Sequence, residues 1–253
     1  MSSDKRRHTA LTVVRRDGAV AVSALAAELG VSVETVRRDL RALEERGLVR
    51  RTHGGAYPAE SAGYETTLTS RATRFVPQKI RIAAAAAKML GDAKTVFIDE
   101  GFTPQLVAAA LPEERPLNVI TSSLTTAGMI CGRRNTQVML LGGRVRGNTA
   151  ATVDHWLTEM LAECVIDLAY VGANGISREF GLTTPDPAVS HVKSQAMHSA
   201  KRRIFSGIHT KFGAVSFCRF AKVEDFEALI TDTSLSRAEA QRYALLGPQV
   251  IRV

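Results

Sequence analysis

The hydrophobic positions of this 253-residue chain change their spacing near residue 90. From there on, short apolar runs alternate with stretches in which apolar residues recur every three or four positions. The short runs predict strands at 95–100, 118–123, 137–143, 167–174, 202–208, 227–232 and 249–253. The stretches between them predict helices at 104–111, 124–131, 154–164, 187–200 and 236–247. Alternating strands and helices indicate an α/β domain with a mostly parallel sheet covered by helices.

The first 57 residues show helical periodicity instead. Residues 1–18 predict a helix that turns Leu11, Val13 and Val14 inward, and a second helix begins at Ser23, whose hydroxyl can cap it. Gly30 suits the left-handed position that ends a helix. Ser32 then caps a third helix with a buried stripe of Val33, Val36, Leu40 and Leu43. This order predicts a helix-turn-helix, and a helical hairpin with a solvated charged face is the alternative.

The exposed side of the third helix carries the residues that a DNA-reading helix needs. Arg37 and Arg38 are the strongest candidates for bonds to base edges, since an arginine can bond guanine bidentately. After Gly47, the segment LVRRTHGG predicts a short basic hairpin, or wing, that brings cations near phosphates. The full DNA-binding prediction comprises Ser32, Glu34, Thr35, Arg37, Arg38, Arg41, Arg50, Arg51 and His53.

Charge and composition support this division. The net charge is +8, and residues 1–57 hold 11 Lys/Arg against 7 Asp/Glu, as expected of a module that meets phosphates. No apolar run approaches the ~20 residues that span a bilayer, and no secretory signal core is present. Three widely spaced cysteines predict buried free thiols in a reducing cytoplasm. We therefore predict a DNA-binding domain at 1–57, a linker at 58–77 and a second domain at 78–253.

Polar residues follow each predicted strand of the second domain. Ligands of parallel sheets bind at the carboxyl ends of the strands, where glycine amides, hydroxyls and cations could hold a small phosphorylated or carboxylated polyol. A Gly-Gly pair can equally be turn geometry, and an isolated Ser or Thr can be only a helix cap. The effector-binding prediction comprises Asp99, Gly101, Thr103, Thr121, Ser122, Gly142, Gly143, Arg144, Asn174, Gly175, Lys193 and Lys211.

These motifs resemble the DeoR family of bacterial transcriptional regulators over nearly the whole chain. The resemblance rests on VSVETVRRDLRALEERGLVRRTHGGA and on IDEGFT, VITSS, LLGGRVR, DLAYVGANGI, FGLTTPD, Val192-Lys193, TKFG and LITD. It implies a cytoplasmic repressor of a sugar or polyol catabolic operon that assembles as a dimer or tetramer. It also implies a sensor domain with a fold similar to phosphosugar isomerases and CoA transferases, which binds a sugar phosphate and releases operator DNA.

The chain departs from the family pattern at four positions. Glu100 and Phe102 interrupt a loop that usually reads Asp-Ser-Gly-Thr-Thr, and Val189 and Ile208 stand where the family often has acidic residues. Because carboxylates commonly bind sugar hydroxyls, the loss of two suggests a different or less hydroxylated effector.

Two other functions fit parts of the sequence. An active isomerase or transferase could use Asp99, Glu100, Asp186 and Lys211 as acids and bases, but nucleotide-binding, hydrolase and metalloprotease motifs are missing. An architectural DNA-binding protein would have no use for the large α/β domain. We therefore predict no catalytic residues, no metal and no cofactor. The predicted partners are double-stranded operator DNA, a small-molecule effector and further copies of the chain, without a membrane.

Overall fold

The computed structural model describes residues 2–17, 20–51, 54–58 and 67–253, which divide into two compact units. The first unit is Met1–Thr66 and the second is Thr67–Val253. Residues 67–77, which the sequence pattern assigned to a linker, are part of the second unit.

The first unit is a three-helix domain with a small antiparallel sheet in the order β1-β3-β2. Its core holds the inward residues of all three helices, including the fully buried Val14, Leu25 and Leu40. Its elements are α1 (Ser3–Asp17), β1 (Val20–Ala21), α2 (Val22–Leu29), α3 (Val33–Glu45), β2 (Val49–Arg51) and β3 (Gly55–Pro58). The predicted helix-turn-helix and wing are therefore present.

Two details of this unit differ from the prediction. Ser23 is not the cap of α2, because the helix begins one residue earlier with Ala21 at the N-cap and no capping side chain. Val33 is 39% exposed, and Asp39 takes a buried place on the helix instead. Gly30 has a φ of 63° and ends α2 in the left-handed conformation, as predicted.

The second unit is built on a seven-stranded sheet, all parallel, in the order β15-β14-β12-β9-β4-β5-β6. These are the seven predicted strands. Their bounds are β4 (Thr95–Ile98), β5 (Leu117–Thr121), β6 (Thr136–Leu140), β9 (Ile166–Val171), β12 (Ala200–Ser206), β14 (Ala228–Thr231) and β15 (Gln249–Arg252).

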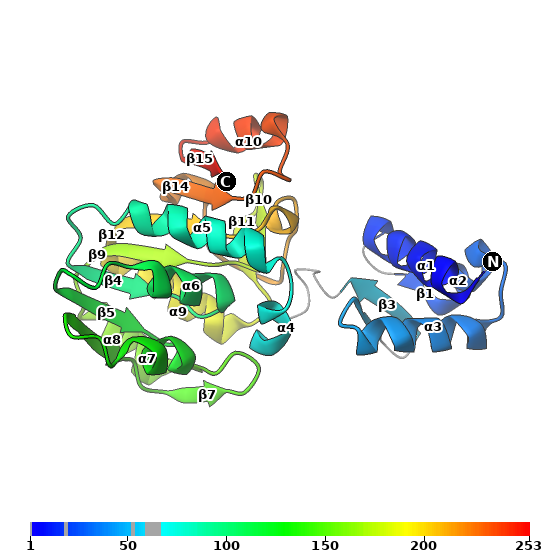
Figure 1. The fold of residues 1–253 in the computed structure, drawn as a ribbon, viewed down its shortest axis with the longest axis horizontal. Helices are drawn as coiled ribbons and strands as arrows, with labels where there is room; N and C mark the ends of the chain where they lie inside the picture. The colour runs from blue at the N-terminus through cyan, green and yellow to red at the C-terminus, as the bar shows by residue number, and fades with distance from the viewer. Residues whose placement is uncertain (1, 18–19, 52–53, 59–66) are drawn as a thin grey trace. The chain divides into compact units, whose positions relative to one another are not determined.

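Helices cover both faces of this sheet, and α5 and α6 lie over the face turned to the viewer in Figure 1. One core layer contains Ile82, Val107 and Ile130 from α5, α6 and α7. The other contains Leu157 and Val192 from α8 and α9. The helices are α4 (Leu68–Ala72), α5 (Val76–Lys88), α6 (Phe102–Ala110), α7 (Leu124–Ile130), α8 (His155–Ala162), α9 (Pro187–Ser199) and α10 (Arg237–Ala244).

Shorter elements, which the periodicity did not predict, connect the strands and helices of the second unit. They are the hairpin β7 (Arg144–Arg146) and β8 (Ala151–Val153), the small sheet of β10 (Gly175–Ser177), β11 (Gly181–Thr184) and β13 (Cys218–Ala221), and the short helices η1 (His209–Lys211) and η2 (Val223–Asp225). Runs of three or four residues are too short to reveal a period.

Candidate nucleic-acid interface and anion site

Helix α3 presents a polar face suited to a groove of DNA. The Ser32 hydroxyl accepts a hydrogen bond from the Thr35 amide at 3.1 Å and lies 2.9 Å from the Thr35 hydroxyl, so the predicted cap is present. Val36, Leu40 and Leu43 are buried as predicted. The helix therefore has a fixed orientation, with its exposed face formed by Glu34, Arg37, Arg38 and Arg41.

A buried carboxylate, absent from the prediction, locks α3 to α1. Asp39 is 1% exposed and forms ion pairs with Arg6 at 2.5 Å and Arg7 at 3.1 Å. Two of the basic residues near the N-terminus thus neutralise an internal charge. The sequence signal for this was an acidic residue one turn after Val36, within the apolar stripe.

The arginines of this unit differ in how freely they can meet DNA. Arg37 lies 3.5 Å from Glu34 in an exposed pair. In the described ranges, Arg38 and Arg41 have no ion-pair partner and extend into solvent. On the wing, Arg51 pairs with Glu44 of α3 at 2.7 Å. Arg50 lies in β2, and His53 lies outside the described residues.

In the second unit, two predicted effector residues hold each other at the carboxyl end of β4. Asp99 is fully buried, and its Oδ2 accepts hydrogen bonds from the Gly172 amide at 2.8 Å and from Lys193 Nζ. Burial raises the pKa of Asp99. Lys193 is 3% exposed, so this ammonium–carboxylate pair lies in the interior beneath the strand ends.

The three predicted hydroxyl residues are buried near the strand ends, and one of them bonds the backbone. Thr121 Oγ1 donates to the Ile98 carbonyl at 2.7 Å and accepts from the Ser123 amide at 3.0 Å. The Ser122 backbone carbonyl accepts a bond from the Thr152 hydroxyl at 3.1 Å. Thr103 is buried in the first turn of α6. The Thr121 hydroxyl therefore holds the ends of β4 and β5 together.

The Gly142-Gly143-Arg144 segment also follows turn geometry. Gly143 has a φ of 146°, and a Cβ there would lie 2.4 Å from the Val153 carbonyl oxygen. Arg144 pairs with Asp154 at 2.7 Å on the exposed hairpin.

Asn174 and Gly175 also form hydrogen bonds within the protein. The Asn174 side-chain oxygen accepts a bond from Thr184 Oγ1 at 3.2 Å, and the Gly175 carbonyl accepts one from Thr183 Oγ1 at 3.3 Å. Both interactions fasten β10 to β11.

A cluster of cations forms the most unusual charge arrangement in the second unit. We call it the cation cluster; it comprises five residues, Arg71, Arg74, Lys79, Lys193 and Lys211. Burial, followed by repulsion from the other four, lowers the pKa of Lys211 to about 7. Burial, followed by Arg71 and Arg74, lowers the pKa of Lys79 to about 8. Each charge in the cluster makes protonation of the neighbouring lysines less favourable.

Three of these five cations were not predicted, because they come from α4, α5 and the turn between them. Lys79 donates to the Arg71 carbonyl at 2.5 Å and lies 5.5 Å from the Phe102 ring. The Arg71 guanidinium lies 3.6 Å from where a Cβ on Gly101 would stand. The cluster therefore reaches the loop after β4, and a side chain at position 101 would narrow the approach to Arg71.

A second set of contacts fixes the two segments that carry the cluster. Phe75, the N-cap residue of α5 with a φ of 53°, packs edge-on against His209 with ring centroids 5.6 Å apart. His209 in turn bonds Asp232 through its amide at 2.8 Å and its Nδ1 at 2.9 Å. Although burial opposes ionisation of Asp232, bonds from His209 and Ser234 lower its pKa. The start of α5 and Lys211 of η1 are thereby held together.

Two buried carboxylate oxygens near the cluster have no hydrogen-bond partner among the described residues. They are Asp99 Oδ1 and Glu100 Oε2. An unpaired buried acceptor costs free energy, so these oxygens are available to hydroxyl or amine donors. The other departures from the family pattern are hydrophobic core residues: Val189 is 2% and Ile208 is 6% exposed.

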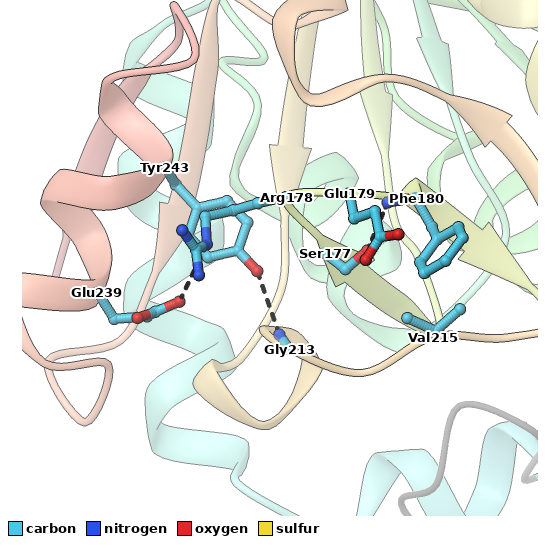
Figure 2. Close-up of a pocket in the computed structure, with 8 residues that line it drawn as sticks. All are labelled: Ser177, Arg178, Glu179, Phe180, Gly213, Val215, Glu239 and Tyr243. Atoms are coloured by element: carbon cyan, nitrogen blue, oxygen red, sulfur yellow. Dashed lines mark hydrogen bonds and ion pairs between the residues drawn. The ribbon is translucent and has the colours of Figure 1, made fainter.

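A separate pocket of about 530 Å³ opens between the β10–β11 hairpin, the loop before β13 and α10 (Figure 2). None of the predicted effector residues lines it. Figure 2 shows Arg178 pointing to Glu239, 3.8 Å away, with Glu179 beside Phe180. One paired cation and two carboxylates disfavour an anion, so a phosphate fits the cation cluster better.

Metal sites, cysteines and membrane-spanning helices are three further features to assess among the described residues. In the ranges that the structure covers, no three His, Cys, Asp or Glu side chains gather as a metal site would require. The three cysteines are free, but Cys131 is exposed and Cys164 and Cys218 are partly exposed, so the prediction of buried thiols was wrong. None of the helices in these ranges has both the length and the apolar character needed to cross a bilayer.

Comparisons with known proteins agree with this two-part organisation. A model of the DeoR-like helix-turn-helix domain matches residues 6–62, and a model of the DeoR C terminal sensor domain matches residues 74–233. The HTH-type transcriptional regulator GlpR of Haloferax volcanii is 32% identical, covering 99% of this chain and 98% of its own. The glycerol-3-phosphate regulon repressor of Escherichia coli is 27% identical, covering 92% of each chain.

Solved structures resemble the chain more distantly. A probable sor operon regulator from Shigella flexneri has a TM-score of 0.43 at 12% identity, over 68% of this chain and 90% of its own. The ribose 5-phosphate isomerase A of Methanocaldococcus jannaschii has a TM-score of 0.37 at 16% identity, over 53% of each chain.

Proposed function

Because this chain belongs to the DeoR family of transcriptional regulators, we propose that it represses a carbohydrate or polyol catabolic operon and leaves its operator when a phosphorylated, sugar-like effector binds. The observation that carries this proposal is the cation cluster: Lys79 bonds the Arg71 carbonyl, the Arg71 guanidinium lies beside Gly101, and burial followed by the neighbouring charges lowers the pKa of Lys211 to about 7. A phosphate dianion would relieve their mutual repulsion and favour the protonated form of Lys211.

The other end of the effector would meet the unpaired carboxylate oxygens. Asp99 Oδ1 and Glu100 Oε2 accept hydrogen bonds but cannot donate them when ionised, so hydroxyl groups suit them. Glu100 would thereby supply one of the two carboxylates lost at Val189 and Ile208. A short phosphorylated polyol combines both ends, and the names of the glycerol-3-phosphate regulon repressors support glycerol 3-phosphate as the first compound to test.

We assign the DNA contacts from the exposed side chains of the first unit. Arg38 would read base edges from α3, with Arg37, Thr35, Glu34 and Ser32 beside it. Arg41 of α3, together with Arg50, Arg51 and His53 of the wing segment, would contact phosphates. Dimers of helix-turn-helix proteins bind two half-sites of an operator, so we propose that the chain acts as a homo-oligomer, in the cytoplasm.

The position of α4 in the chain offers a route for coupling. Arg71 and Arg74 follow directly after the segment that joins the two units. An effector that binds these arginines would bias the conformation of that segment and hence the disposition of the DNA-binding units. By linkage, operator DNA must then weaken effector binding by the same factor.

An isomerase-like activity is the second function to consider, and we propose that the chain lacks it. Asp99 and Lys193 are the closest pair of acid and base, but both are buried and bonded to each other. Steady conversion of a pentose or hexose phosphate by the purified chain, lost in Lys193→Met, would overturn this assignment.

The decisive experiment measures ligand and operator binding on the same protein. Thermal unfolding is followed with glycerol 3-phosphate, hexose phosphates, inorganic phosphate and glycerol, because a ligand of the folded state alone raises its stability. A phosphorylated compound that raises Tm should also displace operator DNA in fluorescence anisotropy.

Lys211→Met tests the site itself. It should lose both responses while still binding the operator. Lys201→Met, which removes an exposed cation paired with Asp167 at 3.0 Å, is the matched control and should keep both. Normal induction in Lys211→Met would overturn the site, and displacement by unphosphorylated polyols alone would overturn the effector class.

A further inference from the structure

The two edge strands of the seven-stranded sheet differ in charge and in exposure. At one edge, β15 carries Arg252, whose guanidinium donates to the Thr233 carbonyl at 2.6 Å, and its last three residues are half-buried. At the other edge, β6 is the uncharged sequence TQVML, and Gln137, Met139 and Leu140 are exposed. Proteins protect a free strand edge with charges, bulges or covering segments. β6 has no charge of its own.

The backbone of β6 is open to another strand. Leu141 donates its amide to the Thr121 carbonyl, and Leu117 donates to the Asn135 carbonyl. Since backbone groups alternate along a parallel strand, the peptide groups of Val138 and Leu140 point away from β5. By this alternation they face the open side of β6, which is the last strand of the sheet.

Apolar side chains flank this edge on both faces of the sheet. Val138 packs in the core layer of α7, so Leu140 shares that face and Met139 the opposite one. Figure 1 shows α7, α8 and β7 at this end of the sheet, with α10 and β15 at the other. The exposed residues are Leu124 (37%), Met129 (41%), Met139 (49%), Leu140 (42%), Val145 (53%), Trp156 (73%) and Met160 (43%). We call this set, with the β6 backbone, the β6 edge surface.

The amount of exposed apolar side chain at this edge suits the core of an interface. The exposed fractions of the seven side chains add up to about three and a half whole residues. A standard interface buries about 800 Å² on each partner, with apolar side chains at its centre. The β6 edge surface supplies apolar side chains for such a centre and backbone groups for hydrogen bonds beside them.

We propose that a second copy of this chain covers the β6 edge surface, with β6 of one copy antiparallel to β6 of the other across a two-fold axis. The pairing joins two seven-stranded sheets into one. Because TQVML carries no charge, pairing of these five residues opposes no like charges, and each copy supplies the apolar surface that the other needs. The choice of a second copy rests on the proposed function, since a two-fold pair presents two DNA-binding units to two half-sites.

The first test measures the mass of the full chain by sedimentation equilibrium, without DNA or effector. The wild type should be a dimer or a multiple of one at micromolar concentration. Met139→Lys should weaken self-association by about a hundredfold or more, since it sets two charges against each other in an apolar interface. Phe217→Lys, which adds the same charge at a residue 82% exposed elsewhere in the unit, should leave the mass unchanged.

A monomeric wild type, or an unchanged mass in Met139→Lys, would refute the proposal. A reduced mass in Phe217→Lys alone would place the interface near the segment before β13 and also refute the proposal. The measurement contains neither effector nor operator. A confirmed dimer that binds no phosphorylated ligand would count against the proposed function and not against this interface.

Disulfide crosslinking provides a test that does not depend on mass. In a background with Cys131, Cys164 and Cys218 changed to Ser, single cysteines are introduced at residues 136–140. Residues opposite each other in an antiparallel pair have Cα atoms about 4.5–5.5 Å apart, within the range of a disulfide. At least one position should crosslink rapidly, and Val215→Cys should not. A dimer that crosslinks at none of the five would pair through another surface.

Discussion

Binding of a phosphorylated effector should weaken steeply between pH 7 and pH 8.5, because Lys211 loses its proton in that interval. The pKa of Lys211 is about 7 in the free protein, owing to its burial and then to the neighbouring cations. An anion binds best when Lys211 is protonated. Above pH 7 the free protein must therefore take up a proton to bind, and affinity falls as pH rises.

The magnitude follows from the two lowered lysines. With a pKa of about 7, the protonated fraction of Lys211 falls about 16-fold from pH 7 to 8.5. With a pKa of about 8, that of Lys79 falls about fourfold. The phosphate ester is already almost a full dianion above pH 7, since its second pKa is about 6. The dissociation constant should rise by about 16-fold from Lys211 alone and by up to about 60-fold from both.

Isothermal titration at several pH values, in buffers of different ionisation enthalpy, measures both the affinity and the protons taken up. Glycerol 3-phosphate is the probe, with inorganic phosphate beside it. Lys211→Arg keeps a positive charge throughout, so its dissociation constant should rise only about fourfold over the same interval. Lys201→Arg, at an exposed ion pair, should behave as the wild type.

A dissociation constant that is independent of pH in the wild type would refute the assignment of Lys211 to the effector site. The same conclusion follows if Lys211→Arg keeps the full pH dependence, because the titrating group would then be another residue.

Three further predictions concern stability and DNA reading. Asp99→Asn should lower the free energy of urea unfolding by about 3–5 kcal/mol, because it leaves the buried Lys193 ammonium without its carboxylate partner. Adding Lys193→Met should recover part of that loss. An unchanged unfolding free energy in Asp99→Asn would contradict the buried pair. Gly143→Ala should cost about 1–3 kcal/mol, because its φ is 146° and a Cβ would meet the Val153 carbonyl; Gly142→Ala, with open space around it, should be near neutral, and equal losses would argue against the turn geometry. Arg38→Ala should lower the binding free energy for the operator by about 1–3 kcal/mol and that for unrelated DNA by less. Arg51→Ala, whose guanidinium pairs with Glu44, should weaken binding to both DNAs equally in anisotropy titrations. The same ratio of losses in both variants would contradict the division between base-reading and phosphate-anchoring residues.

The predictable parts of the fold are the helices and strands in which apolar side chains recur at a regular spacing. The seven strands of the large sheet are short apolar runs bounded by turns, and each was predicted. The third helix of the first unit was predictable because Ser32 and the apolar stripe mark its start and its inner face. Asp39 interrupts that stripe, and its role depends on Arg6 and Arg7, more than thirty residues away, which no local pattern reveals.

The candidate site was predictable only in part, for a related reason. Lys193 and Lys211 were found because they follow strands of a parallel sheet, where ligands bind. Arg71 and Arg74 precede the sheet and sit in segments too short to have a period. The packing of Phe75 on His209, which are 134 residues apart in the chain, brings them towards Lys211. Conversely, Thr121 and Gly143 occupy strand ends for reasons of backbone geometry, and their positions alone could not distinguish that role from ligand binding.

The boundary between the two units has a practical consequence for engineered regulators. A sensor fragment cut at residue 78, where the sequence pattern places the end of the linker, would keep all seven strands of the large sheet but lose Arg71 and Arg74. Such a fragment could fold and still be unresponsive to its inducer. A hybrid repressor that takes its DNA-binding domain from a relative should therefore be joined between residues 59 and 66, so that the transplanted sensor keeps the arginines next to the junction.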